Sequence, residues 1–415
     1  MDGRLLIRDC TLLHADGRLQ GGMSLAVRGG RIEEVAPEAH LPVLPGDWVI
    51  EAGGRTLAPG LMDAYAPLVE RSLIAGLGGM APERLTRLAS RLSADEREAL
   101  AAHGFSEGLL RGITARICRL HVPESPATHL QAVARAAARV GARAALCVAP
   151  TPDDGAGPLL EQLLAAVELA QAQREHRHLR VGLGWRGALP ADEGLRAGLL
   201  SLLQGASVPV LIAEAPGGAA LLPHLQALAE HGWLAEGTVF ALESALPADA
   251  DAVLEALVQS GALIAVNAEA AVDVVRRGQP QAVERLSGMG EGPMGTLARV
   301  GRALEGLGHT GAGLDASAQR RVLLQAGQVW LSARFGARIG LLEPGAVADL
   351  VLYDWVPSTR NPEGSLWDRL HQRVSWVLVE GRVVVREGAL LGHESVGLAQ
   401  AAARACEAVA DRAAA

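Results

Sequence analysis

Five side chains that suit acid–base or metal chemistry stand at or beside the carboxyl ends of strands that the sequence predicts. They are Asp63, His121, Glu214, Glu243 and Glu291. Carboxylates gathered at one end of a sheet could hold a hard cation such as Mg²⁺ or Ca²⁺. Held in different surroundings, two of them could instead act as a general acid and a general base. The alternative is that they are solvated strand ends, or acids that favour a helix N-terminus.

A second pattern, the His-x-His spacing of His176 and His178, has suitable donors in an unsuitable place. It precedes a predicted strand and follows a helix, where cationic groups favour the helix dipole. In a barrel of parallel strands, that end lies opposite the active site. We therefore expect no metal at these histidines. His121 differs because it follows its strand on the catalytic side, where it could line a pocket.

The composition excludes several classes of function. The 415 residues are 49% hydrophobic and carry a formal net charge of -8, which argues against nucleic acid or an anionic membrane as a partner. All basic residues other than histidine are arginines, so a Schiff-base lysine or a carbamylated-lysine metal bridge is excluded. No apolar run approaches the roughly 20 residues that span a bilayer. We expect a cytoplasmic protein whose widely spaced cysteines stay reduced.

The elements that must position these side chains alternate between strand and helix through the middle of the chain. Such alternation indicates βα units and a parallel sheet. Eight units predict an α/β fold, a distorted (β/α)8 TIM barrel with its active site at the carboxyl ends of the strands. A doubly wound sheet is the alternative, but no predicted strand leads into a Gly-rich phosphate loop. The predicted strands are 56–58 running on to 64, 113–120, 142–148, 179–184, 208–213, 238–242, 263–266 and 287–290.

Both ends of the chain have the composition of β structure. Short apolar runs occur at 5–7, 24–28 and 31–35, and again at 348–353, 375–379 and 382–386. We expect the two ends to form one small β-sandwich domain. The predicted division is a β-sandwich over 1–58 and 339–392, a barrel over 59–338 and a C-terminal helix within 393–415. A capping box, Ser93 to Glu96, predicts the start of a barrel helix.

Three segments together carry a resemblance to a known family. Thr56–Ala66 (TLAPGLMDAYA) looks like the first barrel strand of the amidohydrolase superfamily, which normally ends in His-x-His. Ile339–Val351 (IGLLEPGAVADLV) and Val377–Val384 (VLVEGRVV) resemble that superfamily's C-terminal segments. The best match within it is the SsnA-type branch, related to cytosine and guanine deaminases and triazine chlorohydrolases. By this resemblance Asp349 belongs to the β-domain and has a structural hydrogen-bonding role.

The resemblance implies a divalent metal that lowers the pKa of a bound water, held by histidines and an aspartate at strand ends. Aliphatic residues or glycine occupy every one of those positions here, so we expect no cofactor and no metal of the usual kind. The catalytic glutamate of the family falls close to Pro216. The positions of the metal ligands and of the strand-six histidine fall on Ala64, Ala66, Ala213, Leu242 and Gly292.

The predicted function is that of a catalytically degenerate amidohydrolase-fold protein. Such a chain would be a structural or regulatory subunit of a larger enzyme complex, or a binder of a small heterocyclic ligand. The alternative is a hydrolase of C–N bonds, aminohydrolase- or deaminase-like, with a metal-free or hard-metal site. Weakly polar helix faces, such as 131–140 and 159–172, favour a protein partner or a homo-oligomer over a monomer.

Overall fold

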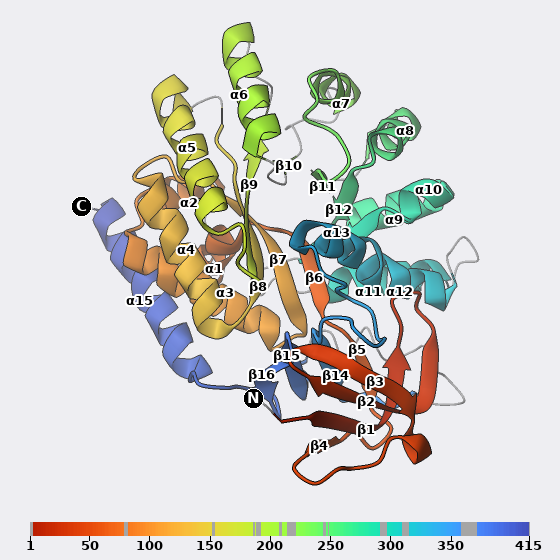
Figure 1. The fold of residues 1–415 in the computed structure, drawn as a ribbon. Helices are drawn as coiled ribbons and strands as arrows, with labels where there is room; N and C mark the ends of the chain where they lie inside the picture. Colours follow the sequence, from red (N-terminus) through yellow and green to blue (C-terminus); the bar gives the residue numbers. More distant parts are fainter. Residues whose placement is uncertain are drawn as a thin grey trace.

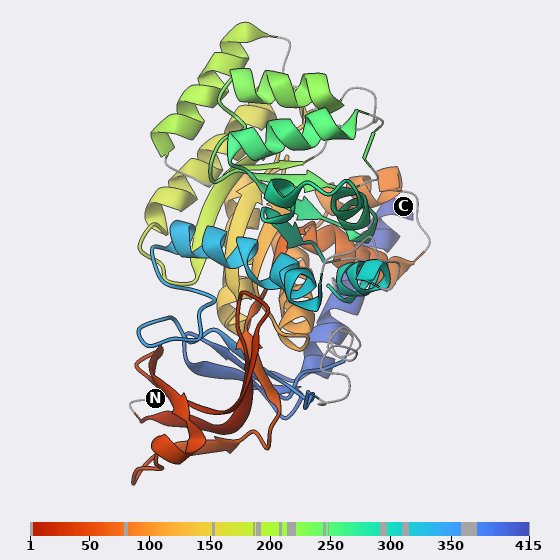
Figure 2. The same cartoon turned by 90° about the vertical axis from the view of Figure 1, so that its right-hand side faces the viewer.

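The chain folds around two β-sheets, a parallel sheet flanked by helices and a second sheet built from both ends of the chain (Figure 1). The sheet of the two ends lies at one end of the helix-flanked part (Figure 2). This computed structural model describes residues 3–78, 82–151, 154–185, 187, 192–206, 210–213, 221–243, 246–247, 249–290, 297–308, 315–357 and 372–414.

The parallel sheet has eight strands, and each pairs with its predecessor in the chain. This sequential order is what successive βα units produce, because each helix returns the chain to the same end of the sheet. The strand positions predicted from the sequence are confirmed within a few residues. The strands are β6 (Leu61–Ala66), β7 (Ile113–Leu120), β8 (Arg143–Val148), β9 (Leu179–Trp185), β10 (Val210–Ala213), β11 (Val239–Leu242), β12 (Leu263–Val266) and β13 (Leu286–Gly288).

The two outer strands of this sheet, β6 and β13, lie against each other, but no backbone ladder joins them among the described residues. The closed barrel that the sequence predicts is therefore not seen as a continuous ring of hydrogen bonds. A side chain makes the link instead. The backbone N–H of Gly290 donates to the Asp63 carboxylate at 2.8 Å, and Arg71 donates to the same carboxylate at 2.8 Å.

Helices follow the strands and cover the outer face of the sheet (Figure 1). The Ser93 hydroxyl accepts from the backbone of Glu96, and the Glu96 carboxylate accepts from the backbone of Ser93, so the predicted capping box is confirmed. No helix in the described ranges is long and apolar enough to cross a membrane. The helices are α1 (Leu68–Leu77), α2 (Pro82–Ser90), α3 (Ala94–Leu109), α4 (Pro126–Val140), α5 (Ala156–Ala172), α6 (Glu193–Ala206), α7 (Leu221–Glu230), α8 (Ala250–Ser260), α9 (Ala268–Arg276), α10 (Pro280–Val283), α11 (Ala298–Gly308), α12 (Ala316–Leu324), α13 (Ala326–Phe335) and α15 (Ser395–Ala414).

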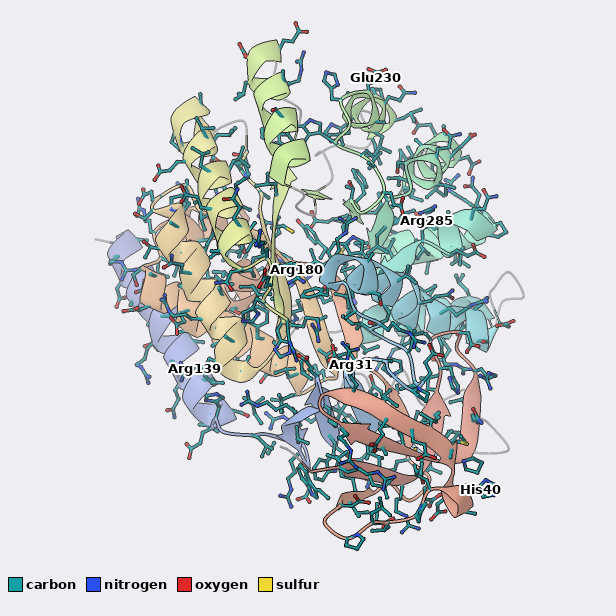
Figure 3. The ribbon with its side chains drawn as sticks, in the orientation of Figure 1. Arg31, His40, Arg139, Arg180, Glu230 and Arg285 are labelled. Atoms are coloured by element: carbon teal, nitrogen blue, oxygen red, sulfur yellow. The ribbon has the colours of Figure 1, made fainter. Side chains whose placement is uncertain are left out.

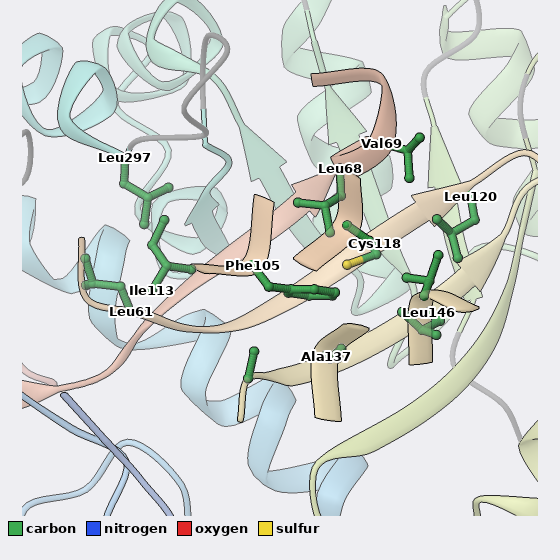
Figure 4. Close-up of a cluster of buried hydrophobic side chains, with 14 of the residues drawn as sticks. Leu61, Leu68, Val69, Phe105, Ile113, Cys118, Leu120, Ala137, Leu146 and Leu297 are labelled. Carbon is green, nitrogen blue, oxygen red and sulfur yellow. The ribbon is translucent and has the colours of Figure 1, made fainter. Parts of the chain in front are cut away.

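Alternation along each strand separates two apolar clusters. On β7, Cys118 and Leu120 pack outward among the helices, in the cluster that includes Phe105 of α3 (Figure 4). Ala115 and Ile117 face the other way, into an inner cluster with residues of β6, β8, β11 and β12. The alternation therefore shows which residues of a strand face the helices and which face the inner cluster.

One end of the inner cluster is filled by α13. Its Trp330, Leu331 and Phe335 are buried with the inner strand residues. Arg180, at the start of β9 and labelled in Figure 3, stacks over the Phe335 ring at 4.7 Å and donates to the backbone carbonyl of Arg334. Because this end carries the strand N-termini, α13 lies opposite the carboxyl ends of the strands, where this type of fold carries its active site.

The second sheet contains strands from both ends of the chain, in the order β17-β16-β15-β14-β5-β1-β2-β3, with β4 paired to β1. The prediction that the two ends build one β structure is confirmed. The strands form a single hydrogen-bonded sheet; its division into a two-sheet sandwich, and the domain boundaries, stay predictions. The strands are β1 (Leu5–Leu13), β2 (Leu19–Arg28), β3 (Arg31–Pro37), β4 (Trp48–Glu51), β5 (Thr56–Pro59), β14 (Leu350–Tyr353), β15 (Trp376–Val379), β16 (Arg382–Arg386) and β17 (Ala389–Leu390), and a 3-10 turn, Glu38–His40, follows β3.

The predicted strand from residue 56 to residue 64 is wrong in one respect, because the chain changes sheets at Gly60. β5 pairs with β14 in the terminal sheet, whereas β6 begins the parallel sheet. A Cβ at Gly60 would stand 2.0 Å from Oγ1 of Thr114, so only glycine fits this close approach to the Thr114 side chain.

A buried ion pair joins the two sheets. The guanidinium of Arg143, on β8, donates to both carboxylate oxygens of Asp349 at 2.8 and 3.2 Å. Asp349 precedes β14 and also accepts the backbone N–H of Glu380 at 2.7 Å. Both side chains are at most 2% exposed. The predicted structural role of Asp349 is confirmed, and its partner is a barrel strand.

We predict that Asp349→Ala lowers the free energy of unfolding by about 3–5 kcal/mol, because it leaves the Arg143 guanidinium buried without its counter-charge. The matched control is Asp354→Ala, whose carboxylate pairs with Arg55 while 58% exposed. That change should cost less than about 1 kcal/mol. Urea unfolding of both variants measures the difference; equal losses would contradict a special role for Asp349.

Candidate functional site

The side chains at the positions that the sequence resemblance assigns to the superfamily's metal ligands offer no donor atoms. Ala64 and Ala66 lie on β6 and are fully buried, and Ala64 belongs to the inner cluster. Ala213 ends β10, and Gly292 lies outside the described residues. Methyl groups cannot coordinate a first-row metal. No group of three or more His, Cys, Asp or Glu in the described part of the chain could hold a metal ion.

The position of Leu242 is corrected by the structure. Leu242 and Phe240 pack outward with the helix layer, whereas Val239 and Ala241 face the inner cluster. By the same alternation, the next residue on the inner side of β11 is Glu243, which is exposed at the end of the strand. The position that looks toward the barrel mouth therefore carries a carboxylate and not a leucine.

The other predicted site residues separate into two groups. Asp63 is fully buried in its contacts with Arg71 and Gly290, so its carboxylate has a structural use and is not a free acid at the mouth. Glu214 and Glu291 lie outside the described residues. His121 and Glu243 follow β7 and β11 at the carboxyl ends of the strands, as predicted.

His121 is held by a carboxylate that the sequence analysis missed. Its Nε2 lies 2.8 Å from Oδ1 of Asp154, which follows β8, the neighbour of β7. Asp154 also accepts from the backbone N–H of Thr151 at 3.0 Å and from Nε2 of Gln162 on α5 at 3.0 Å. Burial favours the neutral acid, but His121 and these donors outweigh it and lower the pKa of Asp154 to about 2. The carboxylate is thus ionised near neutral pH, and Nδ1 of His121 is the imidazole nitrogen that faces away from it.

A second missed pair lies beside the first. Arg119, near the end of β7, donates from Nη2 to Oε1 of Glu70 at 3.0 Å, and Glu70 lies in the first turn of α1. Burial opposes the charge of Glu70, but Arg119 and, to a smaller extent, His121 lower its pKa. Burial also opposes the charge of Arg119, but Glu70, Tyr65 and Glu243 raise its pKa. Both members of the pair are therefore charged.

The sequence does contain a signal for Arg119. Ala115, Ile117 and Arg119 share the inner side of β7, and a charged residue in that series is costly unless it is paired. The register agrees, because Arg119 is opposite Cys147, another inner residue. Asp154 gave no comparable signal, because it stands in a Pro- and Gly-rich loop where acids are common.

The loops after β6, β7, β8 and β11 together bring a histidine, carboxylates and a guanidinium to one end of the sheet. This arrangement can remove a proton from water through the imidazole and can stabilise negative charge through the guanidinium. The remaining candidates lie elsewhere. His178 binds Glu380 at 2.6 Å on the other end of the strands, and the four cysteines are buried and free of disulfides. Burial raises the pKa of Cys118 to about 12, which makes it inert.

Comparisons of sequence give short matches only. No family model matches the chain. An adenine deaminase of Rubrobacter xylanophilus is 48% identical over 62 residues, which are 15% of this chain and 10% of the deaminase. An imidazolonepropionase of Acidiphilium cryptum is 34% identical over 88 residues, which are 21% of this chain and 19% of that protein. The chain thus matches less than a fifth of the length of either relative.

Solved structures match almost the whole chain. A triazine hydrolase from Arthrobacter aurescens has a TM-score of 0.77 at 18% identity, over 97% of this chain and 99% of its own. An adenosine deaminase from Xanthomonas campestris with bound zinc has 0.77 at 16%, over 98% of both chains. An amidohydrolase from a Sargasso Sea sample has 0.76 at 15%, over 99% of this chain and all of its own. The chain therefore has the fold of the amidohydrolase superfamily; at such identities the activity must be argued from the site.

We predict that Asp154→Asn removes a pH-dependent part of the stability. The pKa of Asp154 is lower in the folded chain than its ordinary value of 3.8, so its ionised form stabilises the fold above about pH 4. That contribution is lost as the pH falls from about 4 to about 2, and it amounts to about 2 kcal/mol. In urea unfolding, the stability difference between the unaltered protein and the variant should shrink over this window. The control is Asp251→Asn, at an exposed aspartate, and its stability difference from the unaltered protein should not change over this pH range. A stability difference for Asp154→Asn that does not depend on pH would contradict the prediction.

Proposed function

We propose that this protein is a hydrolase of C–N bonds from the amidohydrolase superfamily, with a site at the carboxyl ends of β6, β7, β8 and β11 that works without the superfamily's zinc. One observation carries the proposal. A histidine held by an ionised carboxylate, His121 with Asp154, stands at the end of the strands where this fold performs chemistry. The fold itself is shared with a triazine hydrolase and an adenosine deaminase.

The step assigned to His121 is general-base catalysis. The imidazole takes a proton from a water molecule as the water oxygen attacks the carbon of the C–N bond. The C–O bond forms, the C–N bond breaks, and the same proton passes from the imidazolium to the departing nitrogen. Asp154 fixes the ring and stabilises the imidazolium, as an orienting carboxylate does in a catalytic triad. Arg119 lies close enough to the Glu70–His121 group to stabilise developing negative charge.

The usual zinc of the fold does not fit these residues. The side chains at Ala64, Ala66 and Ala213 offer no lone pair, and the family's histidine position on strand six carries no imidazole. The proposed reaction therefore uses no such metal. Within the superfamily, the SsnA-type branch remains part of the proposal, on the strength of the segments at 56–66, 339–351 and 377–384.

A second candidate function follows from the same alanines. A barrel that has lost its metal ligands could act as a degenerate subunit of an enzyme complex or a homo-oligomer, or as a binder of a small heterocycle. Ala64 and Ala66 are buried and offer no ligand for a metal. General-base catalysis without a metal contributes only about 10²- to 10⁴-fold in rate, and this small contribution favours the second candidate. The two candidates differ in whether a bound ring is hydrolysed.

We predict slow hydrolysis that survives a metal chelator. Purified protein, treated with a chelator, is incubated with adenine, cytosine, hydantoin and a chlorotriazine, and ammonia, chloride and ring-opened products are measured. His121→Gln should reduce the rate by roughly 100-fold or more, because it removes the base. His178→Gln is the matched control, since His178 also binds a carboxylate but at the opposite end of the strands.

The control variant should hydrolyse at the rate of the unaltered protein. Absence of turnover on the whole panel would overturn the hydrolase and leave the binding subunit. Turnover that requires added zinc would overturn the metal-free site.

A further inference from the structure

We propose that Glu70 and Arg119 form a recognition site for the edge of a neutral cyclic amide or amidine, in which an N–H stands next to a carbonyl oxygen or ring nitrogen. The inference rests on the proposed function only in placing the ligand at the carboxyl ends of the strands. It adds the two residues that would recognise the ring edge, which neither the fold nor the His121–Asp154 pair defines.

Arg119 occupies an inner position where apolar residues would be expected. The residues before it on that side of β7, Ala115 and Ile117, belong to the inner cluster, and its neighbour across the ladder is Cys147. The Arg119 side chain is only 7% exposed. A buried guanidinium in such a place costs stability, unless all of its donors have partners.

The pair leaves one donor and one acceptor unused. Nη2 of Arg119 and Oε1 of Glu70 bond to each other at 3.0 Å. Nε of Arg119 and Oε2 of Glu70 are both buried and have no hydrogen-bond partner among the residues that the structure describes. Buried unsatisfied polar atoms are rare in folded proteins and call for a bound water or ligand. Here the two unsatisfied atoms belong to two side chains that are already bonded to each other.

The donor Nε of Arg119 and the acceptor Oε2 of Glu70 determine which kinds of ligand can bind. Nε–H can only donate, and an ionised carboxylate oxygen can only accept. A ligand carboxylate offers two acceptors and would be repelled by Glu70, and an amidinium offers two donors and would be repelled by Arg119. A neutral H–N–C=O or H–N–C=N edge offers one donor and one acceptor, which is the complement of the pair.

Both groups keep the protonation states that this recognition requires. Tyr65 and Glu243 surround Arg119 in addition to Glu70, and these neighbours keep the guanidinium charged despite its burial. His121 follows Arg119 by two residues at the same end of β7, so a ring bound by the Glu70–Arg119 pair would lie at the strand ends where the proposed base stands.

The test compares rings with and without the N–H. Hydantoin, cytosine, adenine and 2-pyridone are titrated into the full-length protein, each beside a counterpart in which every N–H is replaced by N–CH3, and binding is followed by ligand-observed NMR. Benzoate and benzamidinium represent the two excluded charge types. We expect at least one parent ring to bind. Its methylated counterpart should bind roughly 10- to 100-fold more weakly, because one hydrogen bond to a charged group is lost.

Glu70→Gln should weaken the binding of the parent ring by a similar factor. The difference in affinity between the parent and the methylated ring should become smaller. The matched control is Glu107→Gln, because Glu107 also pairs with an arginine, Arg111, but on α3 and away from the strand ends. Equal binding of parent and methylated rings, stronger binding of benzoate, or binding of no ring would overturn the proposal. The comparison of ligands uses the unaltered protein, so it decides the matter even if Glu70→Gln fails to fold.

The binding test and the hydrolysis test can fail independently of each other. Selective binding without turnover would support the recognition site and refute the hydrolase. Turnover that depends on His121 but has the same KM in Glu70→Gln would support the hydrolase and refute the recognition site.

Discussion

The buried contact between Arg143 and Asp349 holds the molecule's two sheets in one arrangement. Arg143 is the first residue of β8, and Asp349 immediately precedes β14, the strand that pairs with β5. The aromatic ring of Phe335 covers the guanidinium at 5.0 Å. This end of the inner cluster is filled by α13 and joined to the terminal sheet, whereas Arg119, His121 and Glu243 lie at the opposite ends of the parallel strands.

The strands determine the site through the two-residue period of their side chains. The inner side of β7 leads from Ala115 through Ile117 to Arg119, and the inner side of β11 leads to Glu243. On β6 the corresponding buried positions carry Ala64 and Ala66. The charged groups described at the strand ends are the guanidinium of Arg119 and the carboxylates of Glu70, Asp154 and Glu243.

Pairing explains why these groups can be buried together. Glu70 forms an ion pair with Arg119, and the Asp154 carboxylate lies within hydrogen-bonding distance of His121, Thr151 and Gln162. Isolated charges would change protonation state or be excluded from such a place. Nε of Arg119 and Oε2 of Glu70 have no hydrogen-bond partner among the described residues, and these are the two atoms that we propose for a ligand.

The order of elements was determined by the sequence itself, because hydrophobic periodicity and capping are local. β7 and β12 begin and end at the predicted residues, the capping box of Ser93 starts α3, and the two ends of the chain share a sheet as predicted. The sequence also gives alanine at residues 64, 66 and 213, whereas the correspondence of these positions to the superfamily's metal ligands stays a prediction. Only the tertiary structure decided which side Leu242 and Glu243 face, that Asp63 links β13 to β6, and that Asp154 meets His121. Those outcomes depend on strand register and on contacts between loops that are 33 residues or more apart, and no local pattern encodes them.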